Sequence, residues 1–256
     1  IVGAQRNAGA LMGLSFAEFV ERIQQSEDSA SAFDIWLAGL NDLGLNHAIL
    51  GYVLPGRDPT RDQYFATNYK TEWLNHYEEQ GYAQADLTLQ QAGHGSGPFS
   101  WERLLERHEL SPFQRRFYGE AADLGLKQGI SSALVSAPGI SAVYSVASDE
   151  PDVDCERVLA EVHARTALLH KVFMDHLAVE MAPAQPLTPR EQEVLTQWAR
   201  GKTAWEISQL LSVSQETVKF HLKNCYAKLG AYGRIAIVKA LYLGLITIDP
   251  EDIQFL

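Results

Sequence analysis

The stretch LTPREQEVLTQWARGKTAWEISQLLSVSQETVKFHLKNCYAKLGA, residues 187–231, decides the fold of the C-terminal part of the chain. A helix is expected to begin at Thr188, because threonine is a good N-cap residue and Glu191 completes a capping box with it. Pro189 suits the first helical position, where its missing N–H costs nothing. Gly201 is a typical helix stop. The pattern therefore predicts a first helix that ends just before this glycine.

Three more helices are predicted after that glycine, at residues 203–211, 215–229 and 234–243. Apolar residues recur in them at helical spacing, Ser214 caps the third helix of the stretch, and Gly244 closes the fourth. Two helices joined by a tight polar turn are typical of a helix-turn-helix, whose second helix enters the major groove of DNA. The alternative is a plain helical bundle whose charges face water.

The motifs TPREQEVL, G-K-T, E-I-S, S-x-x-T-V-K-x-H and K-L-G resemble the C-terminal DNA-binding domain of the LuxR family over nearly the whole stretch. The resemblance implies contact with double-stranded DNA through eight polar side chains: Lys202, Thr203, Ser214, Gln215, Thr217, Lys219, His221 and Lys223. It does not indicate which bases they read.

The charge of the chain is divided unevenly. The formal net charge is −11, yet residues 187–248 hold eight Lys and Arg against four Asp and Glu, a balance of +4, which leaves −15 for the rest. Attraction to phosphate is local, because salt screens it within about 8 Å. This distribution therefore permits DNA binding by an acidic protein.

Composition and length bound the class of protein. The 256 residues, 46% of them hydrophobic and 21% charged, suffice for two globular domains. No run of about 18 apolar residues and no signal peptide is visible, so a cytoplasmic bacterial protein without a membrane span is expected. Cys155 and Cys225 are predicted to be buried free thiols on helices of different domains. The eight histidines form no H-x-x-x-H or H-x-H pair, so no metal, cofactor or enzymatic activity is expected.

Residues 1–181 are predicted to form an α+β domain, an α-β-α sandwich with an antiparallel sheet, ahead of an all-α four-helix domain at 187–256. Helices are expected at 14–25, 32–43, 69–79, 111–124 and 152–180, and a turn or two at 85–91. Strands are expected at 46–54, around Tyr64 and Phe65, at 99–101, and in a hairpin of 129–137 and 140–148. The sequence APAQP at 182–186 holds two prolines and is predicted to be the linker.

An aromatic stripe marks the candidate chemistry of the first domain. Tyr69, Trp73 and Tyr77 recur every four residues, so on a helix they form one face, which is ordinarily core. Asp86 adds a carboxylate that would be costly to bury without a donor, and the amide N–H of a bound ligand could supply one. A lone Asp is more often a helix cap or solvated. We expect an unpaired carboxylate in an empty cleft that packs poorly.

Nine residues of this domain stand at the spacing found in LuxR-type acyl-homoserine-lactone receptors: Tyr69, Trp73, Tyr77, Tyr82, Asp86, Thr88, Trp101, Gly129 and Ser145. The resemblance implies that Trp73 donates to the lactone carbonyl, that Asp86 accepts from the ligand amide N–H, and that Tyr69 donates to the amide carbonyl. Unlike the usual proline of the family, Leu87 follows Asp86 here.

Further roles follow from the same resemblance. Thr88 and Ser145 would add polar contacts, while Tyr77 and Trp101 would wall the acyl chain and the lactone ring. Three residues of the first predicted strand are expected to line the acyl channel: Ile49, Gly51 and Val53.

The resemblance as a whole implies a ligand-responsive quorum-sensing transcription factor that binds an N-acyl-homoserine lactone. A homodimer held through the long helix at 152–180 would read a roughly palindromic promoter site, with RNA polymerase as a further partner. Either activation or repression fits. Two alternatives stay open: a phosphorylation-dependent response regulator, although its alternating β/α receiver pattern is not seen, and a receptor for a different small molecule.

Overall fold

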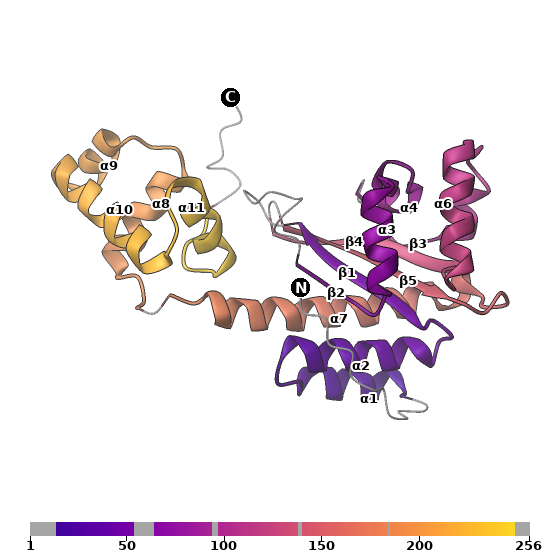
Figure 1. Ribbon diagram of the computed structural model, residues 1–256. Helices are drawn as coiled ribbons and strands as arrows, with labels where there is room; N and C mark the ends of the chain where they lie inside the picture. The colour runs from indigo at the N-terminus through magenta and orange to yellow at the C-terminus, as the bar shows by residue number, and fades with distance from the viewer. Residues whose placement is uncertain (1–13, 54–63, 94–96, 138–139, 184, 249–256) are drawn as a thin grey trace. The chain divides into compact units, whose positions relative to one another are not determined.

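The computed structural model describes residues 14–53, 64–93, 97–137, 140–183 and 185–248 (Figure 1). The chain divides into two compact units, Ile1–His176 and Leu177–Leu256. The first combines helices with an antiparallel sheet and the second is helical, which confirms the predicted fold class. The residue limits expected for the two domains and the linker stay predictions.

A five-stranded antiparallel sheet with the order β2-β1-β5-β4-β3 is the frame of the first unit. Its strands are β1 (His47–Val53), β2 (Tyr64–Thr67), β3 (Phe99–Ser100), β4 (Gln128–Ala137) and β5 (Ile140–Ser148). The central pair β4 and β5 is the expected hairpin, whose turn at 138–139 lies outside the described residues. Ser145 of β5 lies opposite both Ile49 and Ser131. Directly opposed residues point to the same side, so these three share one face.

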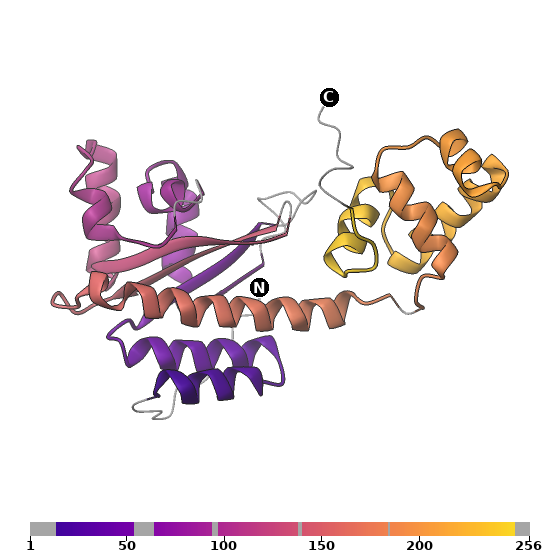
Figure 2. The same ribbon diagram turned by 180° about the vertical axis from the view of Figure 1, so that it is seen from behind.

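Helices cover both faces of this sheet, as Figures 1 and 2 show. On one side lie α1 (Phe16–Gln24), α2 (Ser29–Asn41) and α7 (Cys155–Met181). There the Tyr144 hydroxyl of β5 shares a hydrogen bond of 2.9 Å with His163 Nδ1 of α7, and Trp36 Nε1 donates to Thr166 Oγ1 at 3.1 Å. On the other side lie α3 (Thr71–Glu79), α4 (Leu87–Gly93) and α6 (Pro112–Asp123). The connections include η1 (Tyr82–Gln84) and α5 (Trp101–Leu105).

Side-chain caps set the helix starts in this unit. Ser15, Asp28 and Ser111 each form a capping box at the head of α1, α2 and α6. Because Asp28 is a cap, α2 begins at Ser29 and not at Ala32, where its apolar periodicity starts.

Two aromatic residues lie in elements other than those predicted. Lys70 is the N-cap of α3, so Tyr69 precedes the helix, and the aromatic face of α3 is formed by Trp73 and Tyr77. Trp101 begins α5 instead of ending an edge strand, because the Ser100 side chain accepts from the Arg103 N–H and starts a helix there. The turn or two of helix expected at 85–91 is found as α4, which follows η1.

The second unit consists of α8 (Pro189–Ala199), α9 (Ala204–Leu211), α10 (Gln215–Leu229) and α11 (Gly233–Tyr242). Thr188 and Glu191 form the predicted capping box of α8, and Thr203 with Glu206 forms another at α9. Gly201 follows α8 with a φ of 82°, a left-handed conformation that favours glycine and ends the helix.

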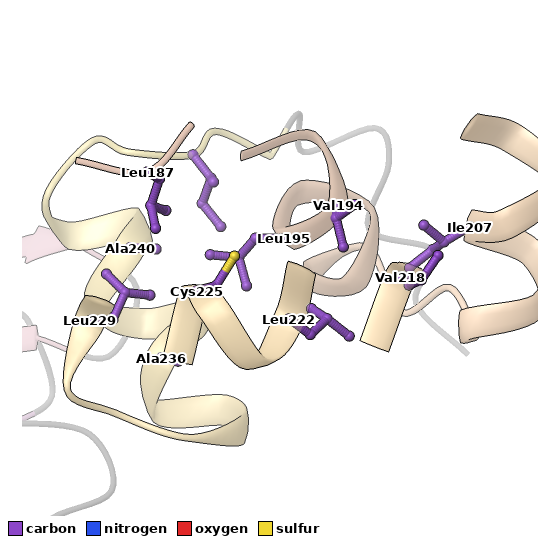
Figure 3. Packing of buried hydrophobic residues seen from close by; sticks show 11 residues of the cluster. Leu187, Val194, Leu195, Ile207, Val218, Leu222, Cys225, Leu229, Ala236 and Ala240 are labelled. Carbon is purple, nitrogen blue, oxygen red and sulfur yellow. The ribbon is translucent and has the colours of Figure 1, made fainter. Parts of the chain in front are cut away.

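One face of α10 closes the core of this unit (Figure 3). Val218, Leu222, Cys225 and Leu229 are buried there at helical spacing. They pack with side chains from the three other helices, including Val194, Leu195, Ile207, Ala236 and Ala240. The second unit therefore has a hydrophobic core of its own.

A buried ion pair ties α8 to α10. Lys228 Nζ lies 2.7 Å from Glu191 Oε2 and also donates to the Pro186 carbonyl at 3.1 Å. The two side chains are 20% and 5% exposed. Burial alone would raise the pKa of Glu191, but the hydrogen bonds from Lys228 and Thr188 outweigh it, so the pKa is lowered. Glu191 thus serves both the helix start and the packing of two helices.

Cys155 and Cys225 are buried free thiols on α7 and α10, as predicted. Burial raises the pKa of Cys155 to about 11 and that of Cys225 to about 12. In the described ranges no helix is long and apolar enough to cross a membrane. In the same ranges no group of His, Cys, Asp and Glu side chains could hold a metal ion.

Candidate functional site

A buried aromatic cluster lies on the α3 and α6 side of the sheet. Trp73 stacks on Phe117 with centroids 6.2 Å apart, and Tyr82 packs against Phe117 at 5.1 Å. Tyr77 meets Trp73 edge-on at 6.2 Å. Trp101 is buried in the same cluster, and Tyr69 and Tyr77 pack against it while only partly buried. Edge-on and stacked contacts fix ring orientation, so the structure brings together the aromatic residues expected at the site.

Asp86 has partners within the protein, so the expectation of an unpaired carboxylate is wrong. Its Oδ1 accepts from the backbone N–H groups of Thr88 at 2.9 Å and Leu89 at 3.1 Å, and from the Thr88 hydroxyl. Its Oδ2 accepts from the Tyr77 hydroxyl at 3.0 Å. Asp86 is therefore a cap of α4 as well as a member of the aromatic site, and Oδ2, with one donor, keeps capacity for another.

Unused donors stand near this carboxylate. Within the described residues, the indole N–H of Trp73 and the hydroxyl of Tyr69 make no hydrogen bond. Burial, and after it the charge of Asp86, raises the pKa values of Tyr69 and Tyr77, so both phenols stay protonated. Tyr69 and Trp73 also border a hollow whose other lining residues are His47, Lys70, Leu124 and Leu126. The site thus offers two donors and part of an acceptor.

A chain of hydrogen bonds links Trp101 to the sheet. Trp101 Nε1 donates to Ser131 Oγ at 2.8 Å, and Ser131 Oγ lies 2.6 Å from Ser145 Oγ. An indole can only donate, so Ser131 must accept from Trp101. Ser131 is fully buried, and either hydroxyl of the Ser131–Ser145 pair can be the donor; donation by Ser131 would satisfy its own proton. In that arrangement the half-buried Ser145 keeps its proton for another acceptor.

Gly129 allows Trp101 to reach this position. A Cβ at residue 129 would lie 2.4 Å from the Val146 carbonyl oxygen and 2.7 Å from a Trp101 ring carbon. Real side chains do not tolerate such distances, so the indole ring requires glycine beneath it.

Two of the three residues expected to line the acyl channel lie on the face of β1 that carries the aromatic cluster. Ile49 and Gly51 pair with Ser145 and Val143, so both point to the side that carries the aromatic cluster. Both are partly buried. Val53 ends β1, and its side chain lies outside the described part of the chain.

Sequence patterns do not identify three polar residues of this region: Ser131, Tyr118 and Glu120. Tyr118 accepts the Leu87 backbone N–H at 3.1 Å. Glu120 accepts from the Tyr82 hydroxyl at 2.6 Å and from Arg116 Nε at 2.7 Å, and its Oε2 also lies 2.8 Å from His76 Nε2. These bonds lower the pKa of Glu120 to about 2. Arg116 lies four residues before Glu120, but the other partners are far apart in the chain, so spacing carries no signal for those contacts.

The helix-turn-helix consists of α9 and α10. On α10, Gln215, Lys219 and Lys223 are exposed along one stripe beside the buried face. His221 is half-buried beside Phe220. Lys202 lies in the turn before α9 and is half-buried. This stripe presents cationic and amide groups suited to phosphates and base edges.

Three of the expected DNA contacts also serve as caps. The Thr203 side chain accepts from the Glu206 N–H and donates to its carboxylate. Ser214 Oγ accepts from the Thr217 N–H at 3.1 Å and lies 2.9 Å from Thr217 Oγ1. Their hydroxyls are partly occupied, so Thr203, Ser214 and Thr217 hold the two helix starts in addition to any contact with DNA.

The fold and the two sites define a two-unit, ligand-responsive DNA-binding regulator. Residues 28–178 match the family described as autoinducer binding domain, and residues 185–241 match the bacterial regulatory proteins of the luxR family. The chain belongs to the LuxR family of quorum-sensing transcriptional regulators.

Individual relatives agree over most of the chain. The HTH-type quorum sensing-dependent transcriptional regulator RpaR of Rhodopseudomonas palustris is 31% identical over 246 residues, 92% of this chain and 96% of that protein. The transcriptional activator protein SolR of Ralstonia nicotianae is 27% identical over 241 residues, 92% of this chain and 100% of that protein. The crystal structure of Escherichia coli SdiA has a TM-score of 0.71 at 22% identity and covers 91% of this chain and 98% of that one, which supports the fold.

Proposed function

We propose that this regulator binds an N-acyl-homoserine lactone in the aromatic site and promoter DNA through α10. One observation carries the ligand assignment. The unused donors of Trp73 and Tyr69 and the half-used Oδ2 of Asp86 supply two donors and one acceptor. The polar end of an acyl-homoserine lactone offers the complement: a lactone carbonyl, an amide carbonyl and an amide N–H.

Each residue takes a role that fits its bonds. Trp73 donates to the lactone carbonyl, Tyr69 donates to the amide carbonyl, and Asp86 accepts the amide N–H. Thr88 and Tyr77 act through Asp86, because their hydroxyls already donate to it. The Trp101 ring forms a wall of the site, and its N–H donates to Ser131. Ser145 donates to a ligand oxygen.

The acyl chain takes the apolar side of this site. Ile49 and Gly51 lie on the sheet face that continues from Ser145, and Val53 follows on the same strand. A pocket that is mostly apolar with a few convergent polar groups suits an amphiphilic ligand.

DNA binding follows from the exposed stripe of α10. Gln215, Lys219 and Lys223 reach base edges and phosphates, and Lys202 and His221 flank them. Thr203, Ser214 and Thr217 place the helix starts against the backbone of the duplex. A homodimer formed through α7 presents two such helices to a roughly palindromic site in the cytoplasm, where RNA polymerase is recruited or blocked.

Ligand binding controls the regulator by mass action. A lactone that fills the aromatic site binds the folded state and not the unfolded chain, so it stabilises the folded receptor. The carboxylate contributes less to this effect than an unpaired one would, because the protein itself already supplies four donors to it.

The test uses tryptophan substitutions in the full chain. Trp73→Phe keeps an aromatic ring and removes the donor, so affinity for N-octanoyl-homoserine lactone should fall about 10- to 100-fold in calorimetry. Trp36→Phe is the matched control, since Trp36 is equally buried but donates to Thr166 on the opposite side of the sheet. Equal affinities of Trp73→Phe and wild type would contradict the assignment. Native mass spectrometry of protein expressed with mixed lactones would identify the preferred acyl chain.

A further inference from the structure

Tyr118 of α6 touches the start of α4 beside the aromatic site. The Leu87 backbone N–H donates to the Tyr118 hydroxyl oxygen at 3.1 Å. Tyr118 packs against the aromatic cluster and contacts Phe117 with centroids 4.7 Å apart. Burial, and after it the Asp86 carboxylate, raises the pKa of Tyr118, so the phenol remains protonated.

The hydrogen bond with Leu87 leaves the hydroxyl proton of Tyr118 available. A phenol has one proton to donate, and Leu87 uses its oxygen as an acceptor. The O–H must therefore donate to a different group. None of the described residues accepts it, which leaves Tyr118 as a third unused donor near Asp86, after Trp73 and Tyr69.

We propose that Tyr118 is a further ligand-binding residue, whose hydroxyl donates to an oxygen at the polar end of the ligand, and that the Leu87 N–H is its positioning group. This inference rests on the proposed function. Tyr118 serves the polar end because its hydroxyl accepts the N–H of Leu87, the residue directly after Asp86, which is the carboxylate assigned to the amide N–H. The acyl chain extends past Ile49 and Gly51 on the sheet.

The position of Leu87 allows a clean test of the positioning role. Leu87 is the first residue of α4, and Asp86 before it supplies the cap. Proline is favoured at a first helical position, where the N–H takes no part in the helix ladder. Leu87→Pro therefore removes the donor to Tyr118 and preserves the helix. Leu87→Ala removes the side chain but keeps the N–H, so it is the matched control.

Affinities of the full chain for N-hexanoyl-, N-octanoyl- and N-decanoyl-homoserine lactone are measured by calorimetry. Tyr118→Phe should lose about tenfold, because a ligand oxygen loses its donor in a dry site. The loss should be the same factor for all three lactones, since the contact lies at the shared polar end. Leu87→Pro should lose about fivefold, and Leu87→Ala should stay within twofold of wild type.

The double variant Leu87→Pro/Tyr118→Phe tests whether the Leu87 N–H acts through the Tyr118 hydroxyl. Leu87→Pro should add nothing to Tyr118→Phe, because the N–H has no phenol left to orient. Additive losses would overturn the positioning role, and a Tyr118→Phe affinity equal to wild type would overturn the ligand contact. A loss confined to one acyl length would overturn the polar-end assignment. If wild-type protein binds none of the lactones, the proposed function itself fails, and this inference fails with it.

Discussion

Glu191 and Asp86 are acidic residues that each accept a backbone N–H at a helix start, yet their surroundings differ. Glu191 accepts the Thr188 N–H at the start of α8, and the remaining charge is matched by Lys228. Asp86 caps α4 through the N–H groups of Thr88 and Leu89, but its Oδ2 has one donor. The Glu191 charge is paired with a lysine inside a closed core. Asp86 accepts from neutral donors, and its Oδ2 keeps capacity in a site with unused donors.

The difference indicates how each unit works. The second unit pairs its buried carboxylate with Lys228 and exposes the polar stripe of α10. The first unit keeps unused donors and a partly buried carboxylate beside its aromatic cluster. Polar groups with unused hydrogen-bonding capacity are expected at functional sites. Four substitutions test this comparison.

Removing Glu191 should have the largest effect. Glu191→Ala leaves Lys228 mostly buried without its partner and opens the capping box, so the unfolding free energy of the second unit should fall by about 3 kcal/mol. Hydrogen exchange of the amides in α8 and α10 measures this loss locally. Glu193→Ala is the control, because Glu193 is 55% exposed on the same helix and pairs with Arg190 at the surface. A loss no larger than that of the control would show that the second unit does not depend on this match.

The same variant gives a pH test. The folded-state pKa of Glu191 lies below its ordinary value of 4.5, so its contribution is present above 4.5 and is lost as pH falls through the folded pKa. Wild-type α8 and α10 should lose protection below pH 4.5 more steeply than those of Glu191→Ala. Parallel pH profiles would contradict this account.

Adding a methyl group at Gly129 should have the next largest effect. Gly129→Ala places a Cβ within 2.7 Å of the Trp101 ring, so the indole or β4 must shift, at a cost of about 2 kcal/mol to the first unit. The amides of β4 and α5 should lose protection while those of α10 do not. Trp101→Leu combined with Gly129→Ala should recover part of the loss, because the clash partner is smaller. Unchanged protection of β4 would show that the ring does not depend on this glycine.

Local signals in the sequence predict much of this molecule. The capping box at Thr188, the glycine after α8 and the periodicity of α10 are encoded within a few residues, and the structure confirms them. The hairpin of β4 and β5 and the long α7 are also found close to their expected positions. Such signals fix helix and strand because their physics is local.

Contacts between distant residues are not predicted in this way. Spacing placed Tyr69 on the helix because periodicity does not show that Lys70 is the cap. It could not reveal that Tyr77 would supply Asp86, or that Ser131 would accept from Trp101. Those pairs arise from packing of α3 on α4 and of α5 on β4, which the sequence does not spell out. The resemblance named most residues of the proposed pocket, and the structure adds the partners that orient them.

Breaking the serine chain should have a smaller effect. Ser131→Ala leaves the buried Trp101 N–H without its acceptor, which should cost the first unit about 1 kcal/mol and free Ser145 to reorient. Lactone affinity should fall about threefold in calorimetry. Ser132→Ala is the control, since Ser132 is also buried on β4 but points to the opposite face of the sheet. Equal lactone affinities of the two variants would show that Ser131 does not contribute to ligand binding.

The smallest effect is expected on the outward side of the second unit. Lys219 is 60% exposed and pairs with the exposed Glu216, so Lys219→Ala should change unfolding by less than about 0.5 kcal/mol. Its loss should show in DNA binding: the slope of log affinity against log salt should fall by about one, because one phosphate contact is lost. Lys127→Ala removes the same charge from an exposed position of the first unit outside α7 and should leave the slope unchanged. Equal slopes for Lys219→Ala and wild type would show that α10 faces DNA with a different stripe. The outward-facing role assigned to this stripe of the second unit would then be wrong.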